Sequence, residues 1–209
     1  MFQKRNFLIL NNVRSPSREF KDVARTAIRD QIISVSDCFY SDPQTGRYVT
    51  PEESDDQLLM ESHNSPGGVG NIPINRNYYY DSIISVFAET ICSSKYGVKA
   101  ITEKTYAPLI QGHFVLPFGY ERMIHDLKNV YGFKFPDWID YSYDDIEDDN
   151  ERLSKYIESI SKLRQLSLQE LADLANRDID IRVHNRNIFF NRPYDSLYNK
   201  ICDRMNSIK

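Results

Sequence analysis

The stretch AITEKTYAPL (residues 100–109), followed closely by FVLPFG (residues 114–119), gives the strongest indication of the fold class. In the first stretch, Thr102 marks a helix start, which predicts a helix over residues 102–111 that Pro108 should kink. The second stretch is a short apolar run that ends in glycine, which indicates a buried strand. A helix that leads into a buried strand is typical of a parallel sheet.

Earlier in the chain, the same alternation is repeated. Short apolar runs predict strands over residues 7–10, 31–35 and 82–87. The first two strands are separated by a helix that should start at Ser15-Pro16, with proline at the first helical position. Its apolar face should carry Val23, Ala24, Ala27 and Ile28. Its charged residues should lie mostly on the other side: Arg18, Lys21, Asp22, Arg25 and Arg29.

Beyond Gly119 the pattern becomes increasingly helical. One helix should end before Gly132 and direct three residues inward, Met123, Ile124 and Leu127. A second should bury a stripe formed by Leu153, Tyr156, Ile157, Ile160 and Leu163. The motif SLQE at residues 167–170 is a capping box that should start a further helix, and a last helix is expected around residues 194–205.

Residues 36–80 interrupt this rhythm and are expected to form a loop-rich insert with a short helix over residues 51–60. The insert contains Gly67, Gly68 and Gly70, which neither follow a strand nor open a helix. A phosphate-binding glycine loop is therefore not indicated there.

A length of 209 residues favours one domain. We therefore predict an α/β fold over residues 1–209, a single Rossmann-like domain in which helices flank a mostly parallel sheet. A helical C-terminal segment should occupy residues 148–209.

The composition narrows the possible partners and location. The net charge of -4 and the pI of about 5.6 argue against a nucleic-acid partner, because such proteins usually present a basic surface. Cys38, Cys92 and Cys202 are odd in number and form no Cys-x-x-Cys pair, which favours reduced thiols in the cytoplasm. The apolar run at residues 7–10 is too short for a signal peptide or a membrane span, so we expect no membrane partner.

The Thr102-Glu103-Lys104 sequence brings an acid and a base to a helix start. Such a start offers free backbone N–H groups and the positive end of the helix dipole. Lys104 is therefore suited to hold a diphosphate, while Glu103 can accept hydrogen bonds from sugar hydroxyls. This combination favours a nucleotide-sugar; the alternative is an ordinary solvated acid–base pair.

Three further residues should lie at the same edge of the sheet. Glu89 follows the strand over residues 82–87, where ligands of open parallel sheets bind, and would contact the ribose or sugar or be an ordinary loop acid. Arg14 and Arg18 flank the first strand-to-helix turn, where they would clamp phosphate or lie on the surface as plain arginines.

The order of these residues resembles the donor-binding half of GT-B type glycosyltransferases. In the fucosyltransferases, a strand that ends in an acid precedes a Thr-Glu-Lys helix and then a hydrophobic strand that runs into glycine. Residues 85–90, 102–104 and 115–119 take these three places here. A wider resemblance, to uncharacterised glycosyltransferase-like proteins of phages and bacteria, covers most of the chain. It includes residues 7–11, Arg14, Arg18 and residues 132–135, 139–144 and 183–185.

This resemblance implies the C-terminal half of a GT-B fold. The donor site would comprise Arg14, Arg18, Glu89, Thr102, Glu103, Lys104 and Gly119. Glu103 would bind the ribose or a nearby sugar hydroxyl, Lys104 the diphosphate, and Thr102 would cap the helix. Sugar transfer builds negative charge on the departing diphosphate, which a fixed cation and helix N–H groups stabilise without a metal or another cofactor.

The resemblance also implies a two-domain enzyme, of which 209 residues accommodate one half. A partner chain, a second copy in a homo-oligomer or residues 36–80 would have to supply the acceptor side. Otherwise, the chain is a non-catalytic nucleotide-binding or interaction protein. A base that faces the donor pocket would distinguish the two, and the candidates are His63, His113, His125, His184 or a carboxylate.

The acidic run DDIEDD (residues 144–149) offers the carboxylates that hard cations prefer. It lacks the glycine and ligand spacing of a calcium loop, and a helix dipole favours carboxylates before a helix. We therefore assign no metal to it. A nuclease is disfavoured, because these acids lie in one local run and not on converging elements.

Overall fold

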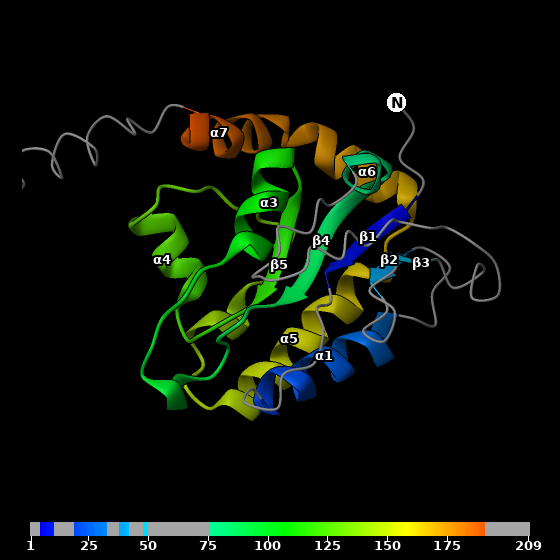
Figure 1. Cartoon of the computed structure of the whole chain (residues 1–209). Helices are drawn as coiled ribbons and strands as arrows, with labels where there is room; N and C mark the ends of the chain where they lie inside the picture. Colours follow the sequence, from blue (N-terminus) through cyan, green and yellow to red (C-terminus); the bar gives the residue numbers. More distant parts are fainter. Residues whose placement is uncertain (1–4, 11–18, 33–37, 42–47, 50–75, 191–209) are drawn as a thin grey trace, which may run out of the picture.

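The computed structural model describes residues 5–10, 19–32, 38–41, 48–49 and 76–190. They form a mixed α/β fold in which helices flank a five-stranded sheet with the order β3-β2-β1-β4-β5 (Figure 1). The strands are β1 (Arg5–Leu10), β2 (Cys38–Ser41), β3 (Tyr48–Val49), β4 (Ser82–Ala88) and β5 (Phe114–Phe118). All neighbouring strands pair in parallel except β3, which pairs antiparallel with β2.

The order of the strands reverses at β1. The chain places β2 on one side of β1 and then β4 and β5 on the other side. In the register, Leu10 lies opposite Phe87, and Ala88 lies opposite Phe118. The carboxyl ends of β1, β4 and β5 therefore lie together at one edge of the sheet. In open parallel sheets, ligands bind outside this edge at the point of reversal.

Helices cover both faces of the sheet. One face carries α1 (Glu19–Ile32), α5 (Asp149–Leu163) and α6 (Leu168–Arg177). The other carries α3 (Glu103–Gln111), α4 (Met123–Asn129) and α7 (Ile179–Phe190). Three short helices complete the described fold: α2 (Arg76–Asp81), η2 (Ser94–Tyr96) and η3 (Ser142–Asp145).

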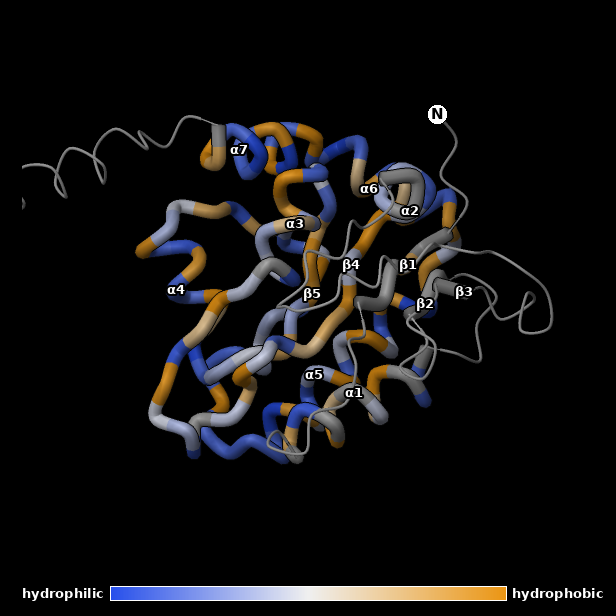
Figure 2. Tube along the Cα trace, viewed as in Figure 1, coloured by the Kyte–Doolittle hydropathy of each residue, from blue (hydrophilic) through white to orange (hydrophobic). Residues whose placement is uncertain are grey.

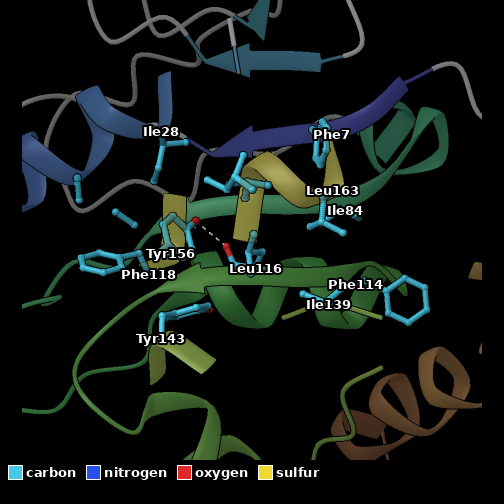
Figure 3. Packing of buried hydrophobic residues seen from close by; sticks show 14 of the residues in the cluster. Phe7, Ile28, Ile84, Phe114, Leu116, Phe118, Ile139, Tyr143, Tyr156 and Leu163 are labelled. Atoms are coloured by element: carbon cyan, nitrogen blue, oxygen red, sulfur yellow. Dashed lines mark hydrogen bonds between the residues drawn. The ribbon is translucent and has the colours of Figure 1, made fainter. Parts of the chain in front are cut away.

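Alternate residues of β4 and β5 point into two hydrophobic cores. Leu116 and Phe118 face the α1 and α5 side, where they pack with Ile28 and Tyr156 (Figure 3). Val115 faces the other side, within the core that α3 and α4 complete. Both strands are buried along their whole length, as is usual for central strands of a parallel sheet. Hydrophobic and hydrophilic residues alternate along the covering helices (Figure 2).

The central part of the chain follows the sequence prediction closely. The predicted strands over residues 82–87 and 114–118 are β4 and β5, and the predicted helix over residues 102–111 is α3 with Thr102 as its N-cap. The inward residues of α4 are buried as predicted: Met123, Ile124 and Leu127. The stripe of α5 and the capping box of α6 are also confirmed, although Ile157 is only partly buried.

Two predictions for the N-terminal part were wrong. No strand begins at Gln31, because Gln31 and Ile32 belong to the last turn of α1. Residues 33–35 of the predicted strand lie outside the described residues, and the next described strand begins at Cys38. Contacts with α5 stabilise this turn. The side-chain amide of Gln31 donates to the hydroxyl of Ser161 at 2.5 Å, and the backbone carbonyl oxygen of Gln31 accepts from the guanidinium of Arg164 at 2.5 Å.

The buried face of α1 also differs from the prediction. Val23 is 52% exposed, whereas Lys21 is only 5% exposed and lies on the same face as Ala24 and Ile28. The apolar pattern misled here because a lysine occupies a position at helical spacing from the core residues.

Several predicted features lie outside the described residues: the helix start at Ser15-Pro16, the helix over residues 51–60, the glycines at 67–70 and the helix around residues 194–205. The described parts of the predicted insert contain β2, β3 and α2. Among the described helices, none is long and apolar enough to cross a membrane.

Candidate functional site

Glu89 lies directly after β4, at the carboxyl edge of the sheet, and is 0% exposed. Its Oε1 atom accepts from the backbone N–H of Thr102 at 3.1 Å and from the hydroxyl of Thr105 at 2.5 Å. Its Oε2 atom accepts from the backbone N–H of Thr90 at 3.0 Å and from the hydroxyl of Thr102 at 2.6 Å. The backbone N–H of Glu89 donates to the carbonyl oxygen of Phe118 at 2.8 Å. Glu89 therefore fastens the start of α3 to the ends of β4 and β5.

Lys104 lies in the first turn of α3 and is 5% exposed. Its Nζ atom donates to the hydroxyl oxygens of Thr90 at 3.2 Å and Thr102 at 3.3 Å. The hydroxyl oxygen of Thr102 also caps α3 by accepting from the backbone N–H of Lys104 at 3.4 Å. Since the same hydroxyl donates to Glu89, it separates a buried cation from a buried acid at the helix start.

A second buried pair of a cation and an acid, Arg152 and Asp149, adjoins the loop that follows β4. Arg152 of α5 donates to the carbonyl oxygen of Cys92 at 2.9 Å and to Asp149 Oδ1 at 2.5 Å. Its guanidinium carbon lies 5.4 Å from the centre of the Phe118 ring. Asp149 also accepts from the hydroxyl of Ser93. These contacts tie the start of α5 to the segment that follows β4.

The pKa of the Cys92 thiol reflects the charges that surround residues 89–93. Burial raises the pKa of Cys92 to about 12, and the nearby cations of Lys21 and Arg152 act in the opposite direction. Lys21 of α1 therefore lies close enough to influence the loop. Among the described residues that adjoin residues 89–93, buried cations outnumber buried acids. The cations are Lys21, Lys104 and Arg152, and the acids are Glu89 and Asp149.

The structure brings the predicted residues Glu89, Thr102 and Lys104 together. Gly119 lies at the same edge, after β5, where a Cβ atom would come within 2.0 Å of the Met123 sulfur. A side chain at residue 119 would therefore require Met123, the first residue of α4, to shift. The backbone of Glu103 begins α3, whereas its side chain lies outside the described part of the structure. Arg14 and Arg18 also lie outside the described residues.

The acidic run of residues 144–149, which begins within η3, caps helices. Both carboxylate oxygens of Asp144 accept backbone N–H groups at the start of α4, from Ile124 and His125, each at 2.9 Å. Burial raises the pKa of Asp144. Asp148 accepts two first-turn N–H groups of α5 at 3.0 and 2.9 Å. In the described part of the chain, no group of three or more His, Cys, Asp or Glu residues is arranged to hold a metal.

The histidines occupy different places. His113 is buried at the start of β5, at the opposite edge of the sheet from Lys104. His184 of α7 contacts the carbonyl oxygen of Gly132 at 2.9 Å. His125 lies in the first turn of α4, which follows β5 at the carboxyl edge. His63 lies outside the described residues.

Lys21 and Arg152 are buried charges that were not predicted from the sequence. Arg152 precedes Tyr156 by four residues, so it shares the buried side of α5. Lys21 precedes Ala24 by three residues on α1. These spacings were visible in the sequence. For Arg152, local acceptors are available on Ile146, Glu147 and Asp149. A further acceptor, the carbonyl oxygen of Cys92, lies 60 residues earlier in the chain.

Two hollows lined by described residues lie away from the cluster of Glu89, Thr102 and Lys104. One of about 830 Å³ lies at the C-terminal end of α3, beside α6 and α7. The other, of about 590 Å³, runs along α1 and α5. Neither is lined by Glu89, Thr102 or Lys104.

No protein-family model matches this chain, and no curated protein or solved structure matches it significantly.

Proposed function

We propose that this protein is glycosyltransferase-like, with a Rossmann-like GT-B donor domain that binds a nucleotide-diphosphate sugar and transfers the sugar to an acceptor. The observation that carries the proposal is the position of Lys104, a buried cation in the first turn of α3. This turn lies beside the edge at which the order of the strands reverses. A cation next to helix N–H groups at such an edge is suited to a diphosphate.

Arg14, Arg18 and Glu103 are included among the donor-binding residues because of the resemblance to glycosyltransferases.

Glu89 is assigned a positioning role in place of the direct ribose or sugar contact that its position at the end of a strand predicts. Both of its oxygens already accept two hydrogen bonds from the protein. A sugar hydroxyl would have to displace one of these donors. Glu89 therefore acts on the ligand through Thr102 and Lys104.

In the proposed transfer, the bond between the anomeric carbon and the diphosphate oxygen breaks, and its electron pair stays on that oxygen. The acceptor hydroxyl forms the new bond to the anomeric carbon and gives its proton to a base. Lys104 and the first N–H groups of α3 stabilise the departing diphosphate. A partner chain, a second copy or residues 36–80 would supply the acceptor side. The cysteine content favours the cytoplasm as the location.

The test begins with thermal-shift screening against UDP-, GDP-, ADP- and CDP-sugars and the free nucleotides. We expect one nucleotide series to raise the melting temperature, because a ligand that binds only the folded state stabilises it. Calorimetry then compares Lys104→Gln with Lys155→Gln, which removes an exposed charge from α5. The first should bind the diphosphate ligand at least about tenfold more weakly, and the second should bind like the unmodified protein.

Circular dichroism should show that Lys104→Gln is folded. A folded Lys104→Gln protein with unchanged affinity for the diphosphate would refute the site.

The second candidate is a non-catalytic nucleotide-binding protein. Each oxygen of the Glu89 carboxylate accepts two hydrogen bonds from the protein, so this acid is not available to take a proton from an acceptor. This observation favours the non-catalytic protein. Release of free sugar from the bound donor in the absence of an acceptor would support the enzyme. Tight binding without release or transfer would support the binding protein.

A further inference from the structure

The hollow of about 830 Å³ lies at the opposite edge of the sheet from Lys104. It is bordered by Tyr80, which precedes β4, and by Gly112, which precedes β5. Figure 1 shows α7 beside one end of α3. Because α3 has nine residues, its two ends are separated by about 13 Å. The volume of the hollow falls within the usual range for small-molecule sites.

Positive charge dominates the lining of this hollow. Two arginines of α7 contribute to it, Arg182 and Arg186, and no Asp or Glu is among the described residues that line it. Side-chain amides add further hydrogen-bonding groups, from Gln111, Gln169 and Asn176. The protein as a whole has a net charge of -4, so a lining with two cations and no acid contrasts with the overall composition.

Arg182 is the central residue of this site. Its Nε atom donates to the carbonyl oxygen of Gly112 at 2.5 Å, and its guanidinium carbon lies 5.9 Å from the centre of the Phe114 ring. Within the described part of the chain, its two terminal nitrogens have no hydrogen-bond partner and no carboxylate pairs with it. By contrast, Arg152 is paired with Asp149. The guanidinium of Arg182 thus has two donors available for a carboxylate or phosphate.

Apolar side chains form the wall next to Arg182. Ile179 and Val183 belong to α7, and Tyr80 of α2 also lines the hollow. All three are large hydrophobic residues that are exposed. A ligand with an apolar body would cover them, while its charged group would reach the guanidinium.

We propose that this hollow binds a small organic anion whose carboxylate or phosphate pairs with Arg182 and whose apolar body lies against Ile179 and Val183. This site is distinct from the proposed donor site and does not depend on it.

The test uses two naphthalene derivatives of similar size and the full chain. 2-Naphthoate carries a carboxylate, whereas 2-naphthamide is neutral. By titration calorimetry, we expect 2-naphthoate to bind at least about tenfold more tightly than 2-naphthamide. Arg182→Gln should weaken 2-naphthoate binding at least about tenfold, while Lys155→Gln should leave it unchanged. Lys104→Gln should also leave it unchanged, which separates this test from that of the donor site.

Arg182 also contacts Gly112 and Phe114, so a second variant avoids loss of those contacts. Val183→Glu places an acid at the exposed rim, and Val183→Gln is its neutral control. We expect Val183→Glu to bind 2-naphthoate at least about fivefold more weakly than Val183→Gln.

Equal affinity for the two naphthalene derivatives would overturn the proposal, as would equal affinity of the Val183→Glu and Val183→Gln variants for 2-naphthoate. An absence of saturable 2-naphthoate binding up to about 10 mM would also overturn it. An acidic peptide that bound where 2-naphthoate did not would assign the hollow to a protein partner instead.

Discussion

At the scale of single residues, His113 shows how burial changes the chemistry of a side chain. Its Nε2 atom donates to the carbonyl oxygen of Tyr79 at 2.5 Å, so Nδ1 is the nitrogen that accepts from the hydroxyl of Ser85 at 2.9 Å. The ring packs edge-on against Tyr79, with 4.9 Å between the ring centres. Burial lowers the pKa of His113 from 6.5 to about 4, so the imidazole is neutral at pH 7.

We expect His113 to make the folded protein less stable as the pH falls from about 6.5 to about 4. In that window, the unfolded chain binds a proton at residue 113 that the folded protein does not accept. The contribution is therefore complete above pH 6.5 and is lost progressively below it. The difference in pKa corresponds to about 3 kcal/mol of unfolding free energy. Urea unfolding at about pH 7 and about pH 4.5 measures the change.

The variant His113→Gln provides the comparison, because the glutamine amide can place a donor where Nε2 bonds to Tyr79 but does not titrate in this range. Its unfolding free energy should depend less on pH between these two values. The assignment to His113 would be contradicted by an equally steep dependence in the variant and the unmodified protein.

At the scale of elements, the connection between β4 and α3 depends on one carboxylate. Glu89 accepts two hydrogen bonds on each oxygen, and on each oxygen one donor is a backbone N–H. A hydroxyl can rotate to find another partner, whereas a backbone N–H has a fixed direction. The start of α3 is therefore positioned by an acid at the end of the preceding strand.

We expect Glu89→Gln to lower the free energy of unfolding by about 2–3 kcal/mol. Glutamine replaces one oxygen with an NH2 group, so the backbone N–H of either Thr90 or Thr102 would face another donor. Urea denaturation at neutral pH measures the loss.

The matched control is Glu158→Gln on the exposed surface of α5, where Glu158 pairs only with Lys155 in the described structure. This change should alter stability by less than about 0.5 kcal/mol. A Glu89→Gln protein as stable as Glu158→Gln would show that Glu89 does not anchor α3.

The same elements show which features are local enough to be predicted from sequence. Thr102 caps α3, and the capping box starts α6, because an N-cap bonds to residues only two or three positions away. The end of α1 was mispredicted because Gln31 contacts Ser161, 130 residues further along the chain. One acceptor of the buried Arg152 guanidinium, the carbonyl oxygen of Cys92, likewise lies 60 residues earlier, although its other acceptors are local in sequence.

The candidate site also contains some features that local sequence predicts and others that depend on distant parts of the chain. Thr102 and Lys104 were identified from the local helix-start pattern, and the structure brings Glu89 to them because β4 and α3 meet at one edge of the sheet. That Glu89 is saturated by protein donors depends on the course of residues 90–102, which no short sequence pattern specifies.

At the scale of the whole molecule, one sheet contributes side chains to two hydrophobic cores. Residues that alternate along β4 and β5 enter one core or the other, so neither core is complete without both strands. Trp138, the only tryptophan in the chain, reports on this arrangement. Its ring packs edge-on against Phe114 of β5 at 5.1 Å, and its Nε1 atom donates to Asp178 after α6 at 2.9 Å.

Because the two cores share β4 and β5, we expect the described fold to unfold as one cooperative unit. Fluorescence of Trp138 should shift to longer wavelength in urea as its contacts with Phe114 and Asp178 are lost. Far-UV circular dichroism should give the same midpoint and the same dependence on urea. Measurements at two protein concentrations would separate unfolding of the chain from dissociation of an oligomer. A fluorescence transition that precedes the circular-dichroism transition would instead show that the contact between β5 and α6 opens before the sheet does, and the prediction of a single domain would then be wrong.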